Sequence, residues 1–207
     1  MSGNLIIIGS GGHAKVVFEA ILASSPDRRV NVLDDDPLAA ERSLLGVKVS
    51  GTRDWLSANA PDAAVALGLG DNAARLTLLD WLVAQGRAVE TVVHPSAILG
   101  ATVEIGDGAF LAAGSIAIAD ATIGRGVILN TACSVDHDCV IGDGVHIGPG
   151  VRLCGNVKVG PRSLIGVGSA IRPGVTIGSD VVVGAGSAVV ADIPDGSVMA
   201  GCPARRL

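Results

Sequence analysis

From Ala97 to Asp192 the sequence consists of consecutive groups of six residues, without a single insertion. Of these 16 hexads, 15 carry Leu, Ile or Val at the third position, and Ala117 is the exception. The first position is always Ala, Ser, Cys or Val, and Gly is common at the fourth and sixth positions. Short repeats of fixed length stack into a solenoid. The segment therefore predicts a rigid prism whose function lies on its faces, its edges or its ends.

The composition fits an aliphatic solenoid core, because the chain contains only two Phe, two Trp and no Tyr. If three hexads form one triangular coil, the array makes about five coils and a prism about 25 Å long, since neighbouring parallel strands lie about 4.8 Å apart. Cys133 and Cys139 occupy first positions of their hexads, where small residues stand elsewhere. We therefore expect both cysteines to be buried small residues.

Residues 1–93 follow a different pattern, in which short apolar strands alternate with helical segments. This alternation predicts a small Rossmann-like parallel α/β sheet, with a ligand at the carboxyl ends of its strands. Residues 94–192 form the predicted solenoid domain, and residues 193–207 are expected to be an irregular tail. The expected strands are 5–8, 30–33, 47–49 and 63–69, the expected helices are 14–23, 52–58 and 73–85, and the expected ligand-binding ends are 9–13, 34–36 and 70–72.

Charge and hydropathy exclude several classes of function. The net charge is −5 and no basic run exists, which argues against binding to nucleic acid. No apolar run is long enough to cross a membrane, and the first residues lack the basic segment of a signal peptide. We therefore expect a cytoplasmic protein without membrane insertion. The sequence holds no CxxC pair and no cluster of metal ligands, so no metal site is expected.

His137 is the most distinctive polar residue of the hexad array, because Asp136 and Asp138 flank it. One interpretation is a solvated polar corner of the coil. The other is a general base whose imidazole is oriented, and whose pKa is raised, by a neighbouring carboxylate. Such a base suits the deprotonation of an amine or a hydroxyl during acyl transfer. The spacing of the residues alone leaves both interpretations open.

His146 follows His137 by nine residues, which is half of an 18-residue coil. The two side chains are therefore expected on nearly opposite sides of one prism, where they cannot meet within a single chain. In a threefold trimer, the groove between neighbouring prisms would bring His137 of one chain near His146 of the next. This arrangement is a hypothesis that follows from the spacing.

The segment from Gly9 to Ala14 matches the G-x-G-x-x-A fingerprint after a strand and before a helix. Backbone N–H groups at a helix N-terminus favour anions, so the segment predicts a phosphate or nucleotide site. Asp34 or Asp35 stands about where an acid that binds ribose would stand. The evidence for NAD is weaker, because about 90 residues lack the second mononucleotide-binding half.

These features together resemble the bacterial nucleotide-sugar acetyltransferases of the left-handed β-helix superfamily. The chain is similar to the subfamily that N-acetylates UDP- or GDP-linked amino sugars, which also includes relatives described as sialic-acid O-acetyltransferases. The resemblance covers essentially the whole chain. The segments that carry it are 8–14, 33–35, 70–72, 127–131, 135–142, His146, 154–157 and 201–204.

The resemblance implies a homotrimer that binds acetyl-CoA in the groove between adjacent prisms. It implies that His137 takes the proton from the sugar amine during direct attack on the thioester, and that Asp138 raises the basicity of His137. Some relatives carry Glu at the position of Asp138. The positions implied to bind acetyl-CoA are His146, Gly155, Val167 and Ala185, and those implied to bind the nucleotide sugar are Gly11, Gly12, His13, Asp34, Asp35, Gly70 and Asn130.

Three alternatives remain at the level of the sequence. The first is O-acetylation of a sugar such as sialic acid, because a histidine beside an acid serves an amine and a hydroxyl equally well. The second is a dehydrogenase built on the N-terminal fingerprint, against which the short domain argues. The third is a scaffold without catalysis, against which the polar hexad around His137 argues. The nucleotide, whether UDP, GDP or dTDP, and the 4-amino sugar that it carries are not defined by the sequence.

Overall fold

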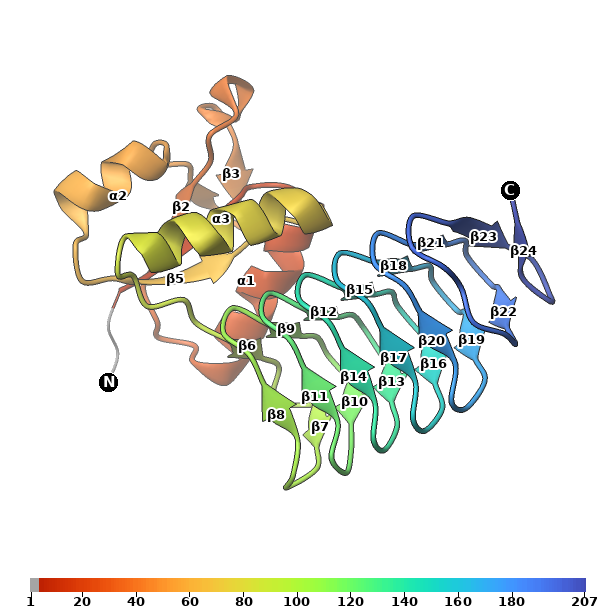
Figure 1. Cartoon of the computed structure of the whole chain (residues 1–207). Coiled ribbons are helices and arrows are strands. Elements are labelled where there is room, and N and C mark those ends of the chain that lie inside the picture. The colour runs from red at the N-terminus through yellow and green to blue at the C-terminus, as the bar shows by residue number, and fades with distance from the viewer. Residues whose placement is uncertain (1–3) are drawn as a thin grey trace.

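The computed structural model describes residues 4–207, which form an α/β region followed by a three-sided solenoid (Figure 1). The α/β region contains a three-stranded parallel sheet with the order β2-β1-β5. The predicted alternation of strands and helices is confirmed. The elements of this region are β1 (Leu5–Ile8), α1 (Gly12–Ser24), β2 (Val30–Leu33), the 3-10 helix η1 (Pro37–Ala39), β3 (Ser43–Leu44), β4 (Val47–Lys48), α2 (Arg53–Asn59), β5 (Ala64–Leu67) and α3 (Asn72–Ala84).

The solenoid is a left-handed β-helix with three sheets, which are parallel except at the last strand of the chain and which we name after one strand each. Strands of successive coils pair in parallel at an offset of 18 residues, as Ile116 pairs with Ser134. The β12 face consists of β6 (Val92–Val93), β9 (Phe110–Leu111), β12 (Ile128–Leu129), β15 (His146–Ile147), β18 (Leu164–Ile165), β21 (Val182–Val183), β23 (Val198–Ala200) and β24 (Arg205–Arg206). The β13 face consists of β7 (Ile98–Leu99), β10 (Ile116–Ala117), β13 (Ser134–Val135), β16 (Arg152–Leu153), β19 (Ala170–Ile171) and β22 (Ala188–Val189). The β14 face consists of β8 (Glu104–Ile105), β11 (Thr122–Ile123), β14 (Val140–Ile141), β17 (Lys158–Val159) and β20 (Thr176–Ile177).

The hexad pattern correctly predicts which side chains fill the solenoid. From the second coil onward, residues at the first and third positions are buried and form one continuous core. At the open end of the first coil the third-position Leu99 is 38 % exposed, because no coil lies beneath it. Cys133 and Cys139 are both 0 % exposed, as expected for small residues that point inward. The core thus consists of stacked aliphatic layers with small residues at the corners.

The two ends of the solenoid differ from the expected pattern. β6 pairs with β9, so the ladder begins at Val92, within the segment assigned to the N-terminal domain. The expectation of an irregular tail was wrong for its central part, since Val198 pairs with Val182 and Met199 pairs with Arg206. The offset from Val182 to Val198 is 16 residues rather than 18. The ladder therefore continues where the six-residue period of the sequence has already ended.

Helix α3 packs against the corner between the β14 face and the β12 face (Figure 1). Gly108, Gly126 and Gly144 occupy the sixth hexad position at this corner, all with positive φ. A Cβ on Gly144 would lie 2.6 Å from two carbon atoms of Leu76 in α3. In the next two coils, beyond these glycines, the same position holds Arg162 and Asp180. Glycine at this corner therefore allows the helix to approach the coils closely.

Arg75 joins α3 to this corner from the inside. Its side chain is 1 % exposed. Its Nε donates to the carbonyl of Gly126 at 2.7 Å, and its Nη2 donates to the carbonyl of Gly144 at 2.8 Å. Further bonds reach the Gly70 carbonyl at 3.0 Å and Asn72 Oδ1 at 2.9 Å. Burial lowers the pKa of Arg75 to about 10, so its guanidinium is charged at neutral pH and held mainly by carbonyl oxygens.

Helix α1 covers the first coils of the β12 face. Phe110 and Ile128 point outward from β9 and β12, yet both are buried in a cluster with residues of α1. The next residue in this outward column is the half-buried His146, and beyond it Val182 is 39 % exposed. The part of the β12 face that the α/β region covers therefore ends at His146. The His146 side chain contacts the α/β region and is also partly open to solvent.

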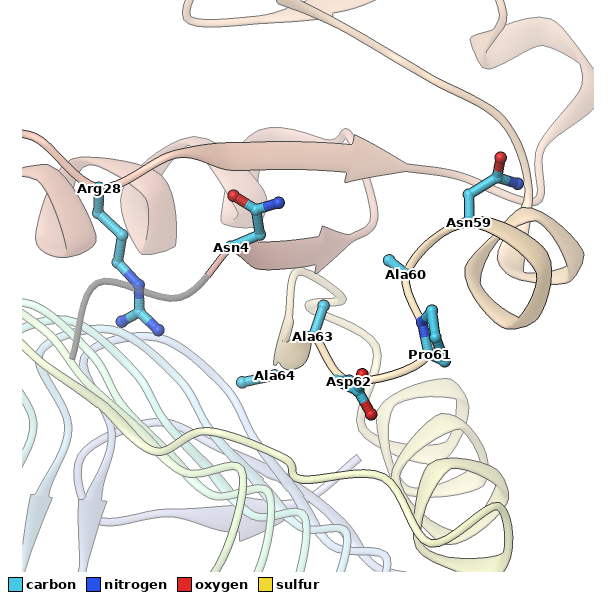
Figure 2. A pocket seen from close by; sticks show the side chains of 8 residues that line it. All are labelled: Asn4, Arg28, Asn59, Ala60, Pro61, Asp62, Ala63 and Ala64. Atoms are coloured by element: carbon cyan, nitrogen blue, oxygen red, sulfur yellow. The ribbon is translucent and has the colours of Figure 1, made fainter.

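A cavity of about 480 Å³ lies at the amino ends of β1 and β5 (Figure 2). Arg28 lines it, but both terminal nitrogens of Arg28 are paired with Glu90 at 2.5 and 2.6 Å. This end of the sheet is opposite the carboxyl ends at which a ligand is expected. None of the helices in residues 4–207 is long and apolar enough to span a membrane.

Candidate functional site

The glycines that follow β1 serve two different purposes. A Cβ on Gly9 would lie 2.9 Å from the backbone of Gly68, so Gly9 allows close packing of the β1 and β5 ends. Gly11 and Gly12 have nothing within 4 Å of such a Cβ. Gly11 caps α1 without any side-chain hydrogen bond to the helix. The N-terminus of α1 is therefore open, and its N–H groups suit an anion such as a phosphate.

Asp34 and Asp35 lie at the carboxyl end of β2, and both interact with the protein. Asp34 Oδ2 accepts from the backbone N–H of Ser10 at 2.7 Å and from its hydroxyl at 2.5 Å. Asp35 forms an ion pair of 2.6 Å with Arg53 and also accepts from the Arg53 backbone N–H at 2.9 Å. Asp34 therefore fixes the turn that precedes α1, and Asp35 fixes the start of α2. Both line a recess of about 200 Å³ together with Gly9 and Thr77.

His13, His146 and Asn130 form a polar cluster between α1 and the β12 face. The ring centroids of His13 and His146 are 6.4 Å apart, and the edge of the His13 ring meets the Phe110 ring at 5.3 Å. Asn130 Nδ2 lies 3.0 Å from His146 Nε2. Gly70 adjoins the cluster, since a Cβ on it would lie 3.6 Å from the Cβ of His13. Four of the predicted site residues, from both regions of the chain, thus meet at one place.

Both histidines of this cluster are neutral at physiological pH. Burial, with smaller contributions from the charges of Arg75 and His146, lowers the pKa of His13 to about 3. Burial, followed by the charge of Arg75, lowers the pKa of His146 to about 4. Within residues 4–207, His13 Nε2 is buried without a hydrogen-bond partner. The cluster therefore offers uncharged hydrogen-bonding groups rather than cations.

The hydrogen bonds of Asn130 define the tautomer of His146. Asn130 Oδ1 accepts from the backbone N–H of Thr131 at 2.8 Å, so the amide nitrogen faces His146. Because that nitrogen can only donate, His146 Nε2 must accept, and in the neutral ring the proton is then on Nδ1. His146 Nδ1 is therefore a hydrogen-bond donor whose ring orientation is held by Asn130.

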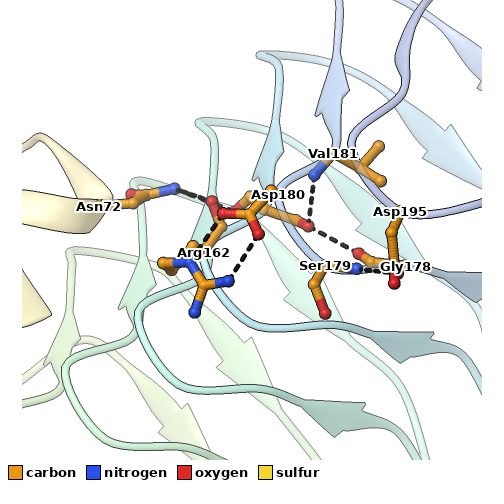
Figure 3. A network of polar contacts seen from close by, with 8 residues as sticks. Asn72, Arg162, Gly178, Ser179, Asp180, Val181 and Asp195 are labelled. Atoms are coloured by element: carbon orange, nitrogen blue, oxygen red, sulfur yellow. Dashed lines mark hydrogen bonds and ion pairs between the residues drawn. The ribbon is translucent and has the colours of Figure 1, made fainter.

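A second recess, of about 280 Å³, extends along the β12 face from His146, and Figure 3 shows the polar network of Arg162 and Asp180 in its wall. Its walls are the segment from Gly70 to Ala73, the outward residues Leu164 and Val182, and the pair of Arg162 and Asp180. Arg162 and Asp180 are joined by bonds of 2.7 and 2.5 Å. Asn72 Nδ2 donates to the carbonyl of Arg162 at 2.9 Å and so connects α3 with this wall. The recess places Gly70 and His146 on the same open surface.

His137 and Asp138 lie at a different corner, between the β13 face and the β14 face. His137 Nδ1 is 2.7 Å from Asp138 Oδ2, and the backbone N–H of His137 donates to Asp136 Oδ1 at 2.8 Å. The hydrogen bond to Asp138 has the largest effect and raises the pKa of His137; burial opposes it with the next largest effect, and the charges of Asp136 and Asp138 raise the pKa further. The imidazole is 52 % exposed. The pair is therefore an oriented base that is open to solvent.

The remaining predicted residues lie at two corners. Gly155 lies one coil after His137 at the same corner. Val167 and Ala185 stack one coil apart at the corner between the β12 face and the β13 face, where the Gly186 N–H donates to the Val167 carbonyl at 2.8 Å. Among the described residues, the backbone N–H groups of Gly155, Val167 and Ala185 have no hydrogen-bond partner. Val167 and Ala185 are exposed, so their N–H groups are available to a ligand that presents carbonyl oxygens.

Apart from Asp34 and Asp35 in their recess and Val167 and Ala185 at their corner, the candidate residues fall into two groups in one chain. His13, Gly70, Asn130 and His146 come together, and the open N-terminus of α1 begins at Gly12 beside them. His137 and Asp138 are on another corner of the prism, as the spacing of nine residues predicts. In residues 4–207 no group of three or more His, Cys, Asp and Glu side chains is arranged to hold a metal ion.

Sequence reasoning missed Arg75 as a residue that shapes the site. Its guanidinium bridges α3 and the solenoid and lowers the pKa of both clustered histidines. A usable signal was present in the sequence, because Arg75 shares one helical face with Leu78, Leu79 and Leu82. A single cation on the buried face of a helix indicates acceptors on the surface against which that helix packs.

Two different family models match the two regions of the chain. Residues 4–82 match the PglD N-terminal domain. Residues 120–155 and 156–191 each match the bacterial transferase hexapeptide family of six repeats. A curated relative, UDP-N-acetylbacillosamine N-acetyltransferase of Bacillus subtilis, is 37% identical over 120 residues, which are 53% of this chain and 51% of that relative. The alignment thus spans about half the length of the curated relative.

Two solved structures match over nearly the whole chain. A mutant of perosamine N-acetyltransferase from Caulobacter crescentus, solved with CoA and GDP-perosamine, is 39% identical with a TM-score of 0.93, covering 100% of this chain and 98% of that one. The acetyltransferase domain of PglB from Neisseria gonorrhoeae, solved with acetyl coenzyme A, is 38% identical with a TM-score of 0.93, covering 99% and 98%. The chain therefore belongs to the nucleotide-sugar N-acetyltransferases of the hexapeptide-repeat, left-handed β-helix family.

Proposed function

We propose that this protein transfers the acetyl group of acetyl-CoA to the amino group of a nucleotide-linked amino sugar, of the 4-amino-4,6-dideoxy type. The two solved relatives bind CoA or acetyl coenzyme A, and one of them also binds GDP-perosamine. The curated relative is named for N-acetyl transfer as well. These relatives favour an amine over a hydroxyl as the acceptor, and they favour catalysis over a scaffold role.

The observation that carries the proposal is the pairing of His137 with Asp138. When Nδ1 donates to Asp138 across 2.7 Å, the neutral ring has its free lone pair on Nε2. His137 Nε2 accepts a proton from the sugar amine as the amine attacks the thioester carbonyl. The C–N bond forms, the C–S bond breaks, and the sulfur leaves with CoA and takes up a proton. Asp138 stabilises the imidazolium that exists in between.

Direct transfer requires no nucleophile on the protein. Cys133 is fully buried, and burial raises the pKa of its thiol to about 12. Cys139 is also buried, which raises the pKa of its thiol, and its Sγ donates to the Cys154 carbonyl at 3.2 Å. A thiolate is therefore disfavoured at both positions. Catalysis rests on proximity of the two substrates and on the general base.

The nucleotide sugar is assigned to the α/β region. Its diphosphate fits the open N-terminus of α1 at Gly11 and Gly12, since no side chain caps this helix. The nucleoside then lies toward the recess beside Asp34 and Asp35. The sugar extends past His13 toward the cluster on the β12 face.

Acetyl-CoA is assigned to the corner that carries Val167 and Ala185, and its thioester end to Gly155 of one subunit and His146 of the next. The free backbone N–H groups of this corner suit the amide carbonyls of the pantetheine arm. The N–H on His146 Nδ1 suits the acetyl carbonyl. Acetyl-CoA supplies the acetyl group as a thioester, and these residues hold it in place.

A complete site requires more than one chain under this proposal. His137 and the cluster of His13 and His146 are on separate parts of one prism. A threefold homotrimer would place His137 of one subunit beside His146 of the next. We propose this assembly together with a cytoplasmic location.

A thiol-release assay tests the proposed function. Acetyl-CoA is incubated with the protein and a panel of UDP-, GDP- and dTDP-linked 4-amino sugars, with free sialic acid as the hydroxyl acceptor. We expect turnover on at least one nucleotide amino sugar and none on sialic acid. Turnover on sialic acid alone would establish O-acetylation instead. Failure on all acceptors, combined with thermal stabilisation by NAD, would favour the dehydrogenase alternative.

A further inference from the structure

The imidazole of His137 lies directly against the backbone of Gly155. A Cβ placed on Gly155 would be 2.4 Å from both Cε1 and Nε2 of His137 and 3.0 Å from its Cδ2. A real Cβ essentially never lies within 3.0 Å of a heavy atom to which it is not covalently linked, so any larger residue at position 155 would have to displace the His137 ring. The two residues are 18 apart and stack on successive coils, where the Asn156 N–H donates to the His137 carbonyl at 2.9 Å.

The backbone of the coil does not itself demand glycine at position 155. Gly155 is buried and is absent from the residues with positive φ. The three atoms nearest its hypothetical Cβ all belong to the His137 ring. By contrast, a Cβ on Gly160 or Gly166, at the fourth hexad position, would meet backbone atoms of the next coil. Residues in the same column as Gly155 carry side chains, namely Ala101, Ala119, Pro173 and Ala191.

We propose that Gly155 is a positioning residue for the catalytic base, and that its missing side chain is what allows His137 to hold its Nδ1 on Asp138. This inference rests on the proposed function for its catalytic meaning, but its geometry does not depend on it. With alanine at position 155, the ring must turn away, and the bond of 2.7 Å to Asp138 Oδ2 is lost. The backbone N–H of residue 155 is unchanged by this substitution, so a contact of that N–H with acetyl-CoA is preserved.

The test compares Gly155→Ala with the wild type by NMR titration of the histidine Cε1 protons. The His137 signal is assigned by its disappearance in His137→Ala. The hydrogen bond to Asp138 is the largest cause that raises the pKa of His137, so its loss lowers that pKa in Gly155→Ala. Pro173→Ala is the matched control, because it lies in the same column, one coil further from the ring, and leaves the titration unchanged.

Steady-state kinetics provide the second readout. We expect kcat of Gly155→Ala to fall on the order of 10- to 100-fold, as displaced catalytic groups do, while the KM for acetyl-CoA changes much less. An unchanged His137 titration in Gly155→Ala would overturn the inference, even if kcat fell. A loss that appears mainly in the KM for acetyl-CoA would also overturn it and assign Gly155 to the co-substrate. The titration needs no substrate, so it decides the inference even if acetyl transfer itself is not observed.

Discussion

The ring centroids of His13 and His146 lie 6.4 Å apart, although His13 is in the first turn of α1 and His146 is in β15, the fourth strand of the β12 face. The contact exists because α1 covers the outward side chains of β9 and β12, and its N-terminal turn, which carries His13, lies next to β15. Both imidazoles are neutral, because burial lowers their pKa values. The two neutral rings lie where the α/β region meets the solenoid. This surface therefore suits an uncharged or weakly polar part of a ligand.

This contact predicts a specific loss of stability in acid. The pKa of His13 is about 3 in the folded state and about 6.5 in the unfolded state, and that of His146 is about 4 in the folded state. The unfolded chain therefore binds more protons as the pH falls below about 6.5, so the free energy of unfolding decreases from there toward about pH 4. Urea unfolding at several pH values measures this decrease.

The matched variants for this prediction are His13→Gln and His94→Gln. His13→Gln removes one buried titrating group, so the free energy of unfolding should fall less steeply with decreasing pH. His94 lies outside the cluster, and its Nδ1 contacts Ser96 at 2.7 Å, so His94→Gln is the control for replacing a histidine elsewhere in the chain. Equal slopes in wild type and His13→Gln would contradict the burial argument.

Replacing the base tests its role directly. His137→Ala should lower kcat at least about 100-fold, which is typical of a lost general base. The unfolding temperature and the oligomeric state should not change, because the side chain is half exposed. His94→Ala serves as the control for the loss of a histidine elsewhere on the solenoid. Turnover close to that of the wild type in His137→Ala would remove this residue from the mechanism.

Asp138 should set the pH range of activity rather than the binding of acetyl-CoA. Activity falls at low pH when His137 becomes protonated, since the base must be neutral. The hydrogen bond to Asp138 is the largest cause of the raised pKa of His137, so Asp138→Asn should move the acidic limb of the kcat profile to lower pH. Asparagine also tolerates the backbone conformation at this position, where φ is +58°. An unchanged profile would leave Asp138 with a structural role only.

Arg75→Met should destabilise the junction of the two regions. The substitution keeps an unbranched side chain but leaves the carbonyls of Gly126 and Gly144 buried without their donor. Each unsatisfied buried group costs about 1–3 kcal/mol, so we expect a loss of roughly 2–6 kcal/mol in the free energy of unfolding. Chemical denaturation measures it, with Arg152→Met on the solenoid surface as the control. A loss no larger than that of the control would show that Arg75 does not hold α3 in place.

The sequence predicts those parts of the fold that repeat or that alternate. The hexads predict the inward residues of the solenoid because one rule applies to every coil, and the N-terminal strands and helices follow from hydrophobic periodicity. The prediction of an irregular tail was wrong because Val198 pairs with Val182 at an offset of 16 residues, which the 18-residue repeat of the coils does not predict. The docking of α3 was not foreseen, because Gly108, Gly126 and Gly144 look like the other turn glycines of the array until the helix is placed on them.

The candidate residues can be proposed from the sequence, but their contacts with one another cannot. The flanking carboxylates make His137 recognisable from the sequence, and its bond to Asp138 needs only adjacent residues. The neighbours of His13 come from the other region of the chain, and Asn130 holds His146 across 16 residues. In the structure, Asp34 accepts a hydrogen bond from the Ser10 hydroxyl and so fixes the turn that precedes α1. The interpretation of Asp34 as a ribose-binding acid does not predict this role.

The most direct test of a site shared between subunits is complementation between two inactive variants. His137→Ala is co-expressed with the double variant His13→Ala/His146→Ala, and mixed oligomers are assayed for thiol release. If each site combines His137 of one subunit with the cluster of the next, random mixing in a threefold ring leaves about one quarter of the sites intact. We therefore predict about a quarter of the wild-type activity from the mixture. Activity no higher than that of the separate variants would contradict a site built between subunits.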